Sequence, residues 1–217
     1  MIGTLTKFAR RVIGSSGSVR SFDAASASRR NRGAGRMNSL PSSALLARGS
    51  IAAQARYLEN NSPIARAVAS AWVANVIGPG IKAQSLHKTP KLRATISAGF
   101  EAWGERADIT GRVDLYAMQA LAVQRMIVDG ECFVLMINTR DGLRLKVVDA
   151  EQLDGGQSRE LGDGRRIVQG IELDPDGRPV AYYIFPQPLN MGIATPSVRI
   201  DAADVCHMMR LDHPFMI

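Results

Sequence analysis

The hydrophobic pattern of this chain changes its period near Gly130, and this change limits the possible folds more than any other feature. Upstream of Gly130, large apolar residues recur at about every fourth position, which is the spacing of one face of an α-helix. Downstream, short apolar or alternating runs are separated by Gly, Pro and Asp, the pattern of β-strands and turns. Helices followed by strands favour an α+β fold over a doubly wound parallel sheet.

Four helical segments are predicted upstream of Gly130. The first is a short stretch over Ile51–Glu59. The second begins at Ser62-Pro63, a favourable helix cap and first position, and stops at Gly78-Pro79-Gly80. The third follows Thr89-Pro90, and the fourth runs from Asp114 to Asp129. The residues that share one face in the last three are Ile64, Val68, Trp72 and Val76; Leu92, Ile96, Phe100 and Trp103; and Leu115, Met118, Ala122 and Met126. Trp72 and Trp103 are expected to be core residues.

The strands are predicted to pair in a mainly antiparallel arrangement. The apolar run Cys132–Ile137 is typical of a strand that is buried on both faces. Turns are predicted at Asp141-Gly142 and over Asp174–Pro179, where Asp, Pro and Gly favour a hairpin. The other predicted strands span residues 143–147, 167–173, 180–185, 198–200 and 205–209.

The positive charge is concentrated at the amino end. Residues 1–50 hold nine Lys or Arg and one acid, a net +8, and the remainder holds 18 basic and 19 acidic groups, a net −1. Residues 14–50 are rich in Ser, Ala, Gly and Arg, which predicts an irregular basic arm that binds phosphate without sequence preference. A disordered, solvated leader is an equally good interpretation. The candidate nucleic-acid contacts in this arm are Arg29, Arg30, Arg32 and Arg36.

No pattern in the sequence requires catalysis. Cys132 and Cys206 lie in apolar runs and predict buried free thiols in a reducing compartment. A Cys-His hydrolase built from Cys132 and His207, with Asp204 as the orienting acid, is the enzymatic alternative, but no nucleophile motif surrounds either cysteine. Gly162-Asp163-Gly164 lacks the phosphate-loop pattern and predicts a hairpin turn instead.

Metals, cofactors and membranes are not expected as partners either. The sequence holds no CxxC, HxxxH or HExxH pattern, so no metal or cofactor is predicted. The longest near-apolar stretch, Ala67–Gly78, is shorter than the roughly 20 residues that a membrane span needs. The chain is therefore expected in the cytoplasm by default.

Five segments in order resemble the lambda-type portal proteins of tailed phages. They are Arg56–Ile81, with its Asn60-Asn61-Ser62-Pro63 turn and Gly78-Pro79-Gly80-Ile81 exit; Met126–Val134, with Asp129-Gly130-Glu131; Leu145–Asp154; Gly170–Tyr183; and Ile200–His207. The chain departs from the family in the Ser that separates Asn61 from Pro63, and the likeness ends after about Met209.

The resemblance implies a structural subunit and not an enzyme. It implies a homo-oligomeric ring at one vertex of the virion, through which double-stranded DNA is packaged and ejected. It also implies terminase, capsid and head-tail connector proteins as partners, with assembly in the cytoplasm of the bacterial host. Residues 1–50 would be a flexible arm and residues 51–217 a wing-like body that lacks the family's stem and clip regions. The alternative is a stand-alone nucleic-acid or partner-binding module that uses the basic arm.

Overall fold

The structure is a computed structural model that describes residues 40–187 and 195–211, with side chains from Arg48 onward. It divides into two units, Met1–Ser43 and Ala44–Ile217. The first unit contributes only the start of one helix to the described residues.

Four helices come first in the described chain, and the sequence signals place their ends. They are α2 (Leu40–Asn61), α3 (Pro63–Val76), α4 (Pro90–Gly104) and α5 (Leu115–Asp129). Ser62 and Asp114 act as the N-caps of α3 and α5, since their side chains accept hydrogen bonds from the amides of Ala65 and Ala117. Gly130 ends α5 in the left-handed region at φ 90°. The predicted starts of these last three helices are confirmed.

Helix α2 is longer than the sequence pattern predicts. It begins at Leu40, whereas order was expected to begin near Ile51. The residues before Ile51 include Pro41, which suits the first turn of a helix, and a run of Ala and Leu with high helix propensity. These residues show no apolar periodicity, so the sequence pattern did not predict this part of the helix. The structure agrees, because Ala52 is the one buried hydrophobic residue among the described side chains of α2.

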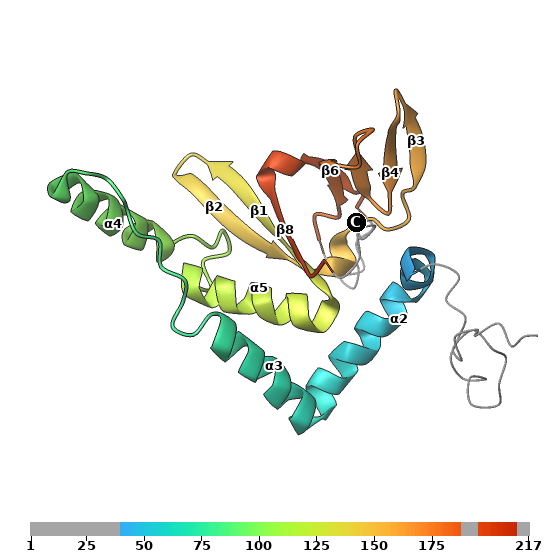
Figure 1. The fold of residues 1–217 in the computed structure, drawn as a ribbon, viewed down its shortest axis with the longest axis horizontal. Helices are drawn as coiled ribbons and strands as arrows, with labels where there is room; N and C mark the ends of the chain where they lie inside the picture. The colour runs from blue at the N-terminus through green and yellow to red at the C-terminus, as the bar shows by residue number, and fades with distance from the viewer. Residues whose placement is uncertain (1–39, 188–194, 212–217) are drawn as a thin grey trace, which may run out of the picture. The chain divides into compact units, whose positions relative to one another are not determined.

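Two antiparallel sheets follow the helices, which confirms the α+β class (Figure 1). Sheet A has three strands in the order β2 (Gly142–Val148), β1 (Glu131–Thr139) and β8 (Val205–Met209). Sheet B has five in the order β3 (Arg159–Gly162), β4 (Arg165–Val168), β5 (Ile171–Leu173), β6 (Pro179–Ile184) and β7 (Val198–Asp201). The apolar run predicted as a strand buried on both faces is β1, at the centre of sheet A.

Sheet B differs from the sequence prediction at one turn. Residues 167–173 were expected to form a single strand, but they form a hairpin of β4 and β5 with a turn at Gln169 and Gly170. Both turn residues have positive φ, 49° and 80°. Gln is seldom found in that region, so the turn carries no strong sequence signal. Strand β3 was also not predicted, although the turn at Gly162-Asp163-Gly164 that joins it to β4 was.

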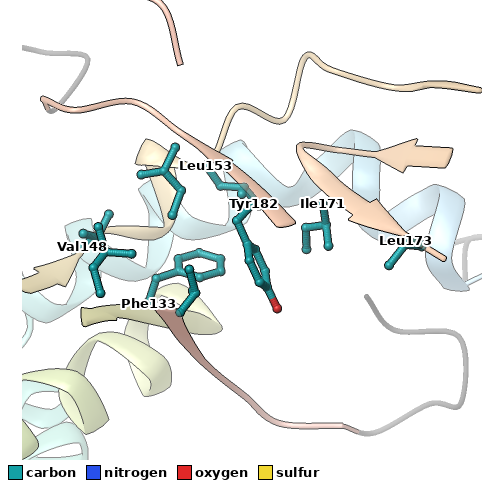
Figure 2. Close-up of a cluster of buried hydrophobic side chains, with 9 residues drawn as sticks. Phe133, Val148, Leu153, Ile171, Leu173 and Tyr182 are labelled. Atoms are coloured by element: carbon teal, nitrogen blue, oxygen red, sulfur yellow. The ribbon is translucent and has the colours of Figure 1, made fainter. Parts of the chain in front are cut away.

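The main core lies between the two sheets. In sheet A, Phe133 is paired with Val148 on one side and His207 on the other, so these three side chains share a face. That face packs against Tyr182 and Ile171 of sheet B, and Leu153 completes the cluster, as Figure 2 shows. The opposite face of sheet A turns Leu145 and Val147 toward a second cluster with Leu115 and Met118 of α5. Helix α5 is therefore the layer that covers sheet A.

Gly170 provides a test of the turn that separates β4 from β5. A Cβ at this position would lie 2.6 Å from the carbonyl oxygen of Asp154, and the backbone has φ +80°. Gly142, at φ +101°, has open space around its missing Cβ. We expect Gly142→Ala to cost about 1–2 kcal/mol from backbone strain alone. Gly170→Ala should cost about 1–3 kcal/mol more, since overpacking adds to the strain.

The measurement is urea unfolding of the two variants and the unsubstituted chain, followed by circular dichroism. Equal destabilisation by the two substitutions would show that the contact between Gly170 and Asp154 is not a tight one.

Candidate functional site

The most unusual surface of the described chain is the outward face of α3. This helix, Pro63–Val76, carries a single charged residue, Arg66. Four large apolar side chains at intervals of four residues are exposed on it, among them Ile64 at 77% and Trp72 at 54%. The full set, here called the α3 face, is Ile64, Val68, Trp72 and Val76. A helix that is apolar on nearly all sides is normally covered on all sides, so this face is suited to bind a partner.

The expectation that Trp72 is a core residue was wrong. The side of α3 that faces inward carries smaller residues, with Ala69 buried and Val73 half-buried, and it packs against α5. Small residues allow two helices to approach closely, and the large apolar residues are then left on the other side. The signal for this arrangement was in the sequence, because Ala65, Ala69 and Val73 also recur at intervals of four. Trp103, by contrast, is half-buried and donates from Nε1 to the carbonyl oxygen of Leu143 at 2.8 Å.

Ion pairs at the junction of α5 and β1 hold helix α2 in place. Arg56 of α2 donates to the buried carboxylate of Asp129 at 2.6 Å and also pairs with Glu151. Arg48 lies eight residues before Arg56 in α2 and pairs with Glu131, which follows Gly130 in the sequence. The hydrogen bond to Asp129 is the largest influence on the Arg56 guanidinium and raises its pKa, despite the opposing effect of burial. The Asp129-Gly130-Glu131 motif therefore anchors α2, from which α3 continues.

A further ion pair joins the carboxyl end of α2 to α5. Arg125 donates to both carboxylate oxygens of Glu59, at 2.8 and 2.7 Å, and Gln124 donates to the same carboxylate at 2.6 Å. Burial by itself would raise the pKa of Glu59, but these hydrogen bonds outweigh burial and lower it. The carboxylate is thus charged at neutral pH and keeps the end of α2 on α5.

Glu131 and His207 form the most buried polar cluster between β1 and β8. Nε2 of His207 lies 2.9 Å from Glu131 Oε2, and its ring stacks on Phe133 with centroids 4.4 Å apart. The hydroxyl of Tyr182 lies 3.5 Å from Nδ1. These contacts join sheet A, sheet B and, through Glu131, the Arg48 side chain of α2. We assign this cluster to the cohesion of the unit, because every polar member is engaged by a neighbour.

The structure separates the two residues of the hydrolase alternative. In the antiparallel pair β1–β8, His207 is opposite Phe133 and Met208 is opposite Cys132. Paired residues share a face and successive residues alternate, so Cys132 and His207 point to opposite faces of sheet A. Burial raises the pKa of the Cys132 thiol to about 12, and Asp149 and Asp129 add to the effect. The thiol is therefore protonated at neutral pH and is a poor nucleophile.

Cys206 corrects a second expectation. Both cysteines were expected to be buried, and the structure shows Cys132 buried and Cys206 exposed. Cys206 lies on the face of β8 opposite to Val205, which packs into the main core, and β8 is an edge strand of sheet A among the described residues. In the apolar run of the sequence, an edge strand and a central strand look alike.

The predicted nucleic-acid contacts Arg29, Arg30, Arg32 and Arg36 lie outside the described residues. Two carboxylates at turns have structural roles: Asp174 accepts from the amide of Arg178 at 2.7 Å, and Asp154 accepts from the hydroxyl of Ser197 at 2.6 Å. Over residues 40–187 and 195–211, no group of His, Cys, Asp or Glu is arranged to hold a metal ion. None of the helices in that same part is both long and apolar enough to cross a membrane.

The two thiols provide a direct test of this geometry. At pH 8 the native chain should react with a thiol reagent such as DTNB at Cys206 alone, because Cys132 is 0% exposed and holds its proton. Cys206→Ser should abolish the fast reaction, and unfolding in guanidinium should release Cys132. Counting the thiols that react within minutes checks this. A fast reaction in native Cys206→Ser would show that Cys132 is accessible.

Comparison with known proteins identifies the family of this chain. The family model described as "Phage portal protein, lambda family" matches residues 27–214. A curated relative from Halomonas phage phiHAP-1, named "Probable portal protein", is 30% identical over 122 residues. That match covers 51% of this chain and 24% of the relative, so the chain spans only a fraction of the relative's length. Since the family model covers most of the chain, this protein belongs to the lambda family of phage portal proteins.

Proposed function

We propose that this chain is a structural subunit of a portal ring, through which DNA is packaged into and ejected from a phage capsid. The observation that carries the proposal is the family match over residues 27–214. Its location would be the portal vertex of the virion, reached from the cytoplasm of the bacterial host during assembly. Terminase, capsid and head-tail connector proteins are the partners expected for such a ring. The body beginning in α2 would correspond to the portal wing.

The α3 face supports a role in assembly. In a closed ring, each subunit presents two different surfaces to its two neighbours. Such contacts need apolar area that is free on the isolated subunit, and the α3 face provides it with Ile64, Val68 and Trp72 in one line. The helix is firmly attached to its own subunit through α5 and the ion pairs of α2. We therefore propose that a second copy of the chain covers this face.

Replacing the α3 face tests the ring and its contact together. We expect the unsubstituted chain to elute as a large closed oligomer, by light scattering after size exclusion and by negative-stain imaging. Ile64→Ser, Val68→Ser and Trp72→Ser combined should convert it to monomers, because the buried apolar area of the contact is lost. The fold should be retained, since exposed positions cost little stability.

The matched control replaces three exposed apolar residues outside α3, namely Leu143, Val198 and Leu211, by Ser. It should leave the ring intact. Rings formed equally well by the α3 variant would remove α3 from the contact. A monomeric unsubstituted chain would mean that it does not assemble unaided, and the ring function should then not be assigned to it alone.

A second candidate function is a stand-alone nucleic-acid-binding module. The observation that favours it is the net charge of +8 within residues 1–50. In this case the arm would bind DNA through phosphate contacts without any requirement for a ring.

Substitution of the arm arginines tests this second function. Arg29, Arg30, Arg32 and Arg36 replaced by Ala should weaken binding to duplex DNA and flatten the dependence of the binding constant on salt. Fluorescence anisotropy with a labelled duplex at several salt concentrations measures both quantities. An unchanged salt slope would show that these arginines do not contact DNA.

A further inference from the structure

The body of the chain is nearly neutral on average, but its charges are unevenly placed. From Ser62 to Phe100 the sequence contains five Lys or Arg and neither Asp nor Glu. This span covers α3, the linker of residues 77–89 and most of α4. From residue 101 onward, the sequence contains 18 acidic and 12 basic residues. The described unit therefore has a positive segment over residues 62–100, which lies outside residues 1–50 of the sequence.

Four of these five cations project into solvent. Lys82, Lys88, Lys91 and Arg93 are all exposed. The fifth, Arg66, is turned back and donates to the carbonyl oxygens of Glu59 and Asn60. We call the four exposed side chains the Lys82–Arg93 surface. It occupies twelve consecutive positions of the chain.

No carboxylate of the described residues neutralises this surface. The arginines that form ion pairs within this part of the chain are Arg48, Arg56, Arg125, Arg165 and Arg199. Lys82 lies over the ring of Tyr116, at 5.7 Å from its centroid, and that contact leaves its charge uncompensated. Among the described residues, the cations of the linker and α4 thus differ from these arginines, because they form no ion pair that joins one element to another.

The linker is fixed at its start and free beyond it. Gln119 of α5 donates to the carbonyl oxygen of Ile81 at 3.1 Å and accepts from its amide at 2.7 Å. From Lys82 onward the linker is exposed, with Leu86 at 94%. The carboxyl end of α4 packs through Phe100 and Trp103 against the α5 cluster, whereas its amino end lies away from β1 and β2 (Figure 1). Lys88, Lys91 and Arg93 therefore lie at or next to the amino end of α4, and Lys82 lies at the start of the linker beside Tyr116.

From these observations we propose that the Lys82–Arg93 surface binds the phosphate backbone of double-stranded DNA without sequence preference. Three of its four cations are lysines, and lysine is depleted at protein–protein interfaces but is well suited to phosphate contact. Gln84, Ser85 and Thr89 alternate with them and add neutral donors of the kind that contact phosphates. The choice of DNA as the polyanion rests on the proposed portal function; the location of the surface does not.

The experiment compares three full-length variants with the unsubstituted chain in binding to a labelled 30-base-pair duplex of mixed sequence. The surface variant carries Lys82→Gln, Lys88→Gln, Lys91→Gln and Arg93→Gln. The control carries Gln at four exposed arginines on other elements that form no ion pair among the described residues, namely Arg106, Arg140, Arg159 and Arg178. Both lower the formal net charge from +7 to +3, since each removes four positive charges. The third variant is the arm substitution described above.

The expected result is a loss specific to the surface variant. Each phosphate contact contributes about 0.9 to the slope of log Kobs against log salt concentration, so the slope should fall by up to about 3.6. The control should keep nearly the full slope, and the arm variant should lose its own separate share. Equal losses in the surface variant and the control would show that net charge alone matters, and would overturn the assignment.

Two further readouts separate this proposal from its alternatives. If the surface variant loses binding to polyglutamate but keeps its duplex slope, the surface binds an acidic protein and the assignment to DNA is wrong. Light scattering of the same samples reports assembly independently. If the surface variant forms rings and keeps the salt slope of the unsubstituted chain, the DNA-binding proposal is wrong and the ring proposal is unaffected. If the unsubstituted chain is a monomer that binds DNA through the Lys82–Arg93 surface, the ring proposal is wrong and the DNA-binding proposal is supported.

Discussion

The left-handed turn at Gly130, with a carboxylate on each side, is the interaction on which the rest of this structure depends. The turn ends α5 and starts β1, the central strand of sheet A. Asp129 and Glu131 then receive Arg56 and Arg48 from α2. A buried carboxylate without its arginine would carry an uncompensated charge, which is strongly destabilising. The chain therefore passes from α5 into sheet A at Gly130, and the two residues beside this glycine also bind α2 through ion pairs.

Two surfaces with different physical character follow from this arrangement. The large apolar residues of the unit are buried mainly between the sheets and under α5, and α3 keeps its own large residues outside. The linker and the amino end of α4, a short distance along the chain, carry charge without compensation. Apolar area favours a permanent protein contact, and exposed lysines favour a weak contact that salt can release. The function that we propose would use both kinds of contact.

Most element boundaries could be predicted because short-range physics determines them. The first amides of α3 and α5 find their hydrogen-bond acceptors in the side chains of Ser62 and Asp114. Helix α5 ends at Gly130 because glycine readily adopts the left-handed conformation. The failures occurred where the decisive contact is distant in sequence. The turn at Gln169-Gly170 is supported by the segment of Asp154 and Gln157. The position of α2 likewise depends on carboxylates that lie far along the chain.

The sequence by itself determined the α+β class, the starts of α3, α4 and α5, and the family, because periodicity, caps and motif order are all local properties of the chain. Only the tertiary structure decided which apolar face of α3 is inside, which cysteine is buried, and which cations lack a carboxylate. Each of these depends on what a residue meets from another element. A helix with small residues on one face and large ones on the other has two possible inner faces, and the close approach of α3 to α5 selects the small one.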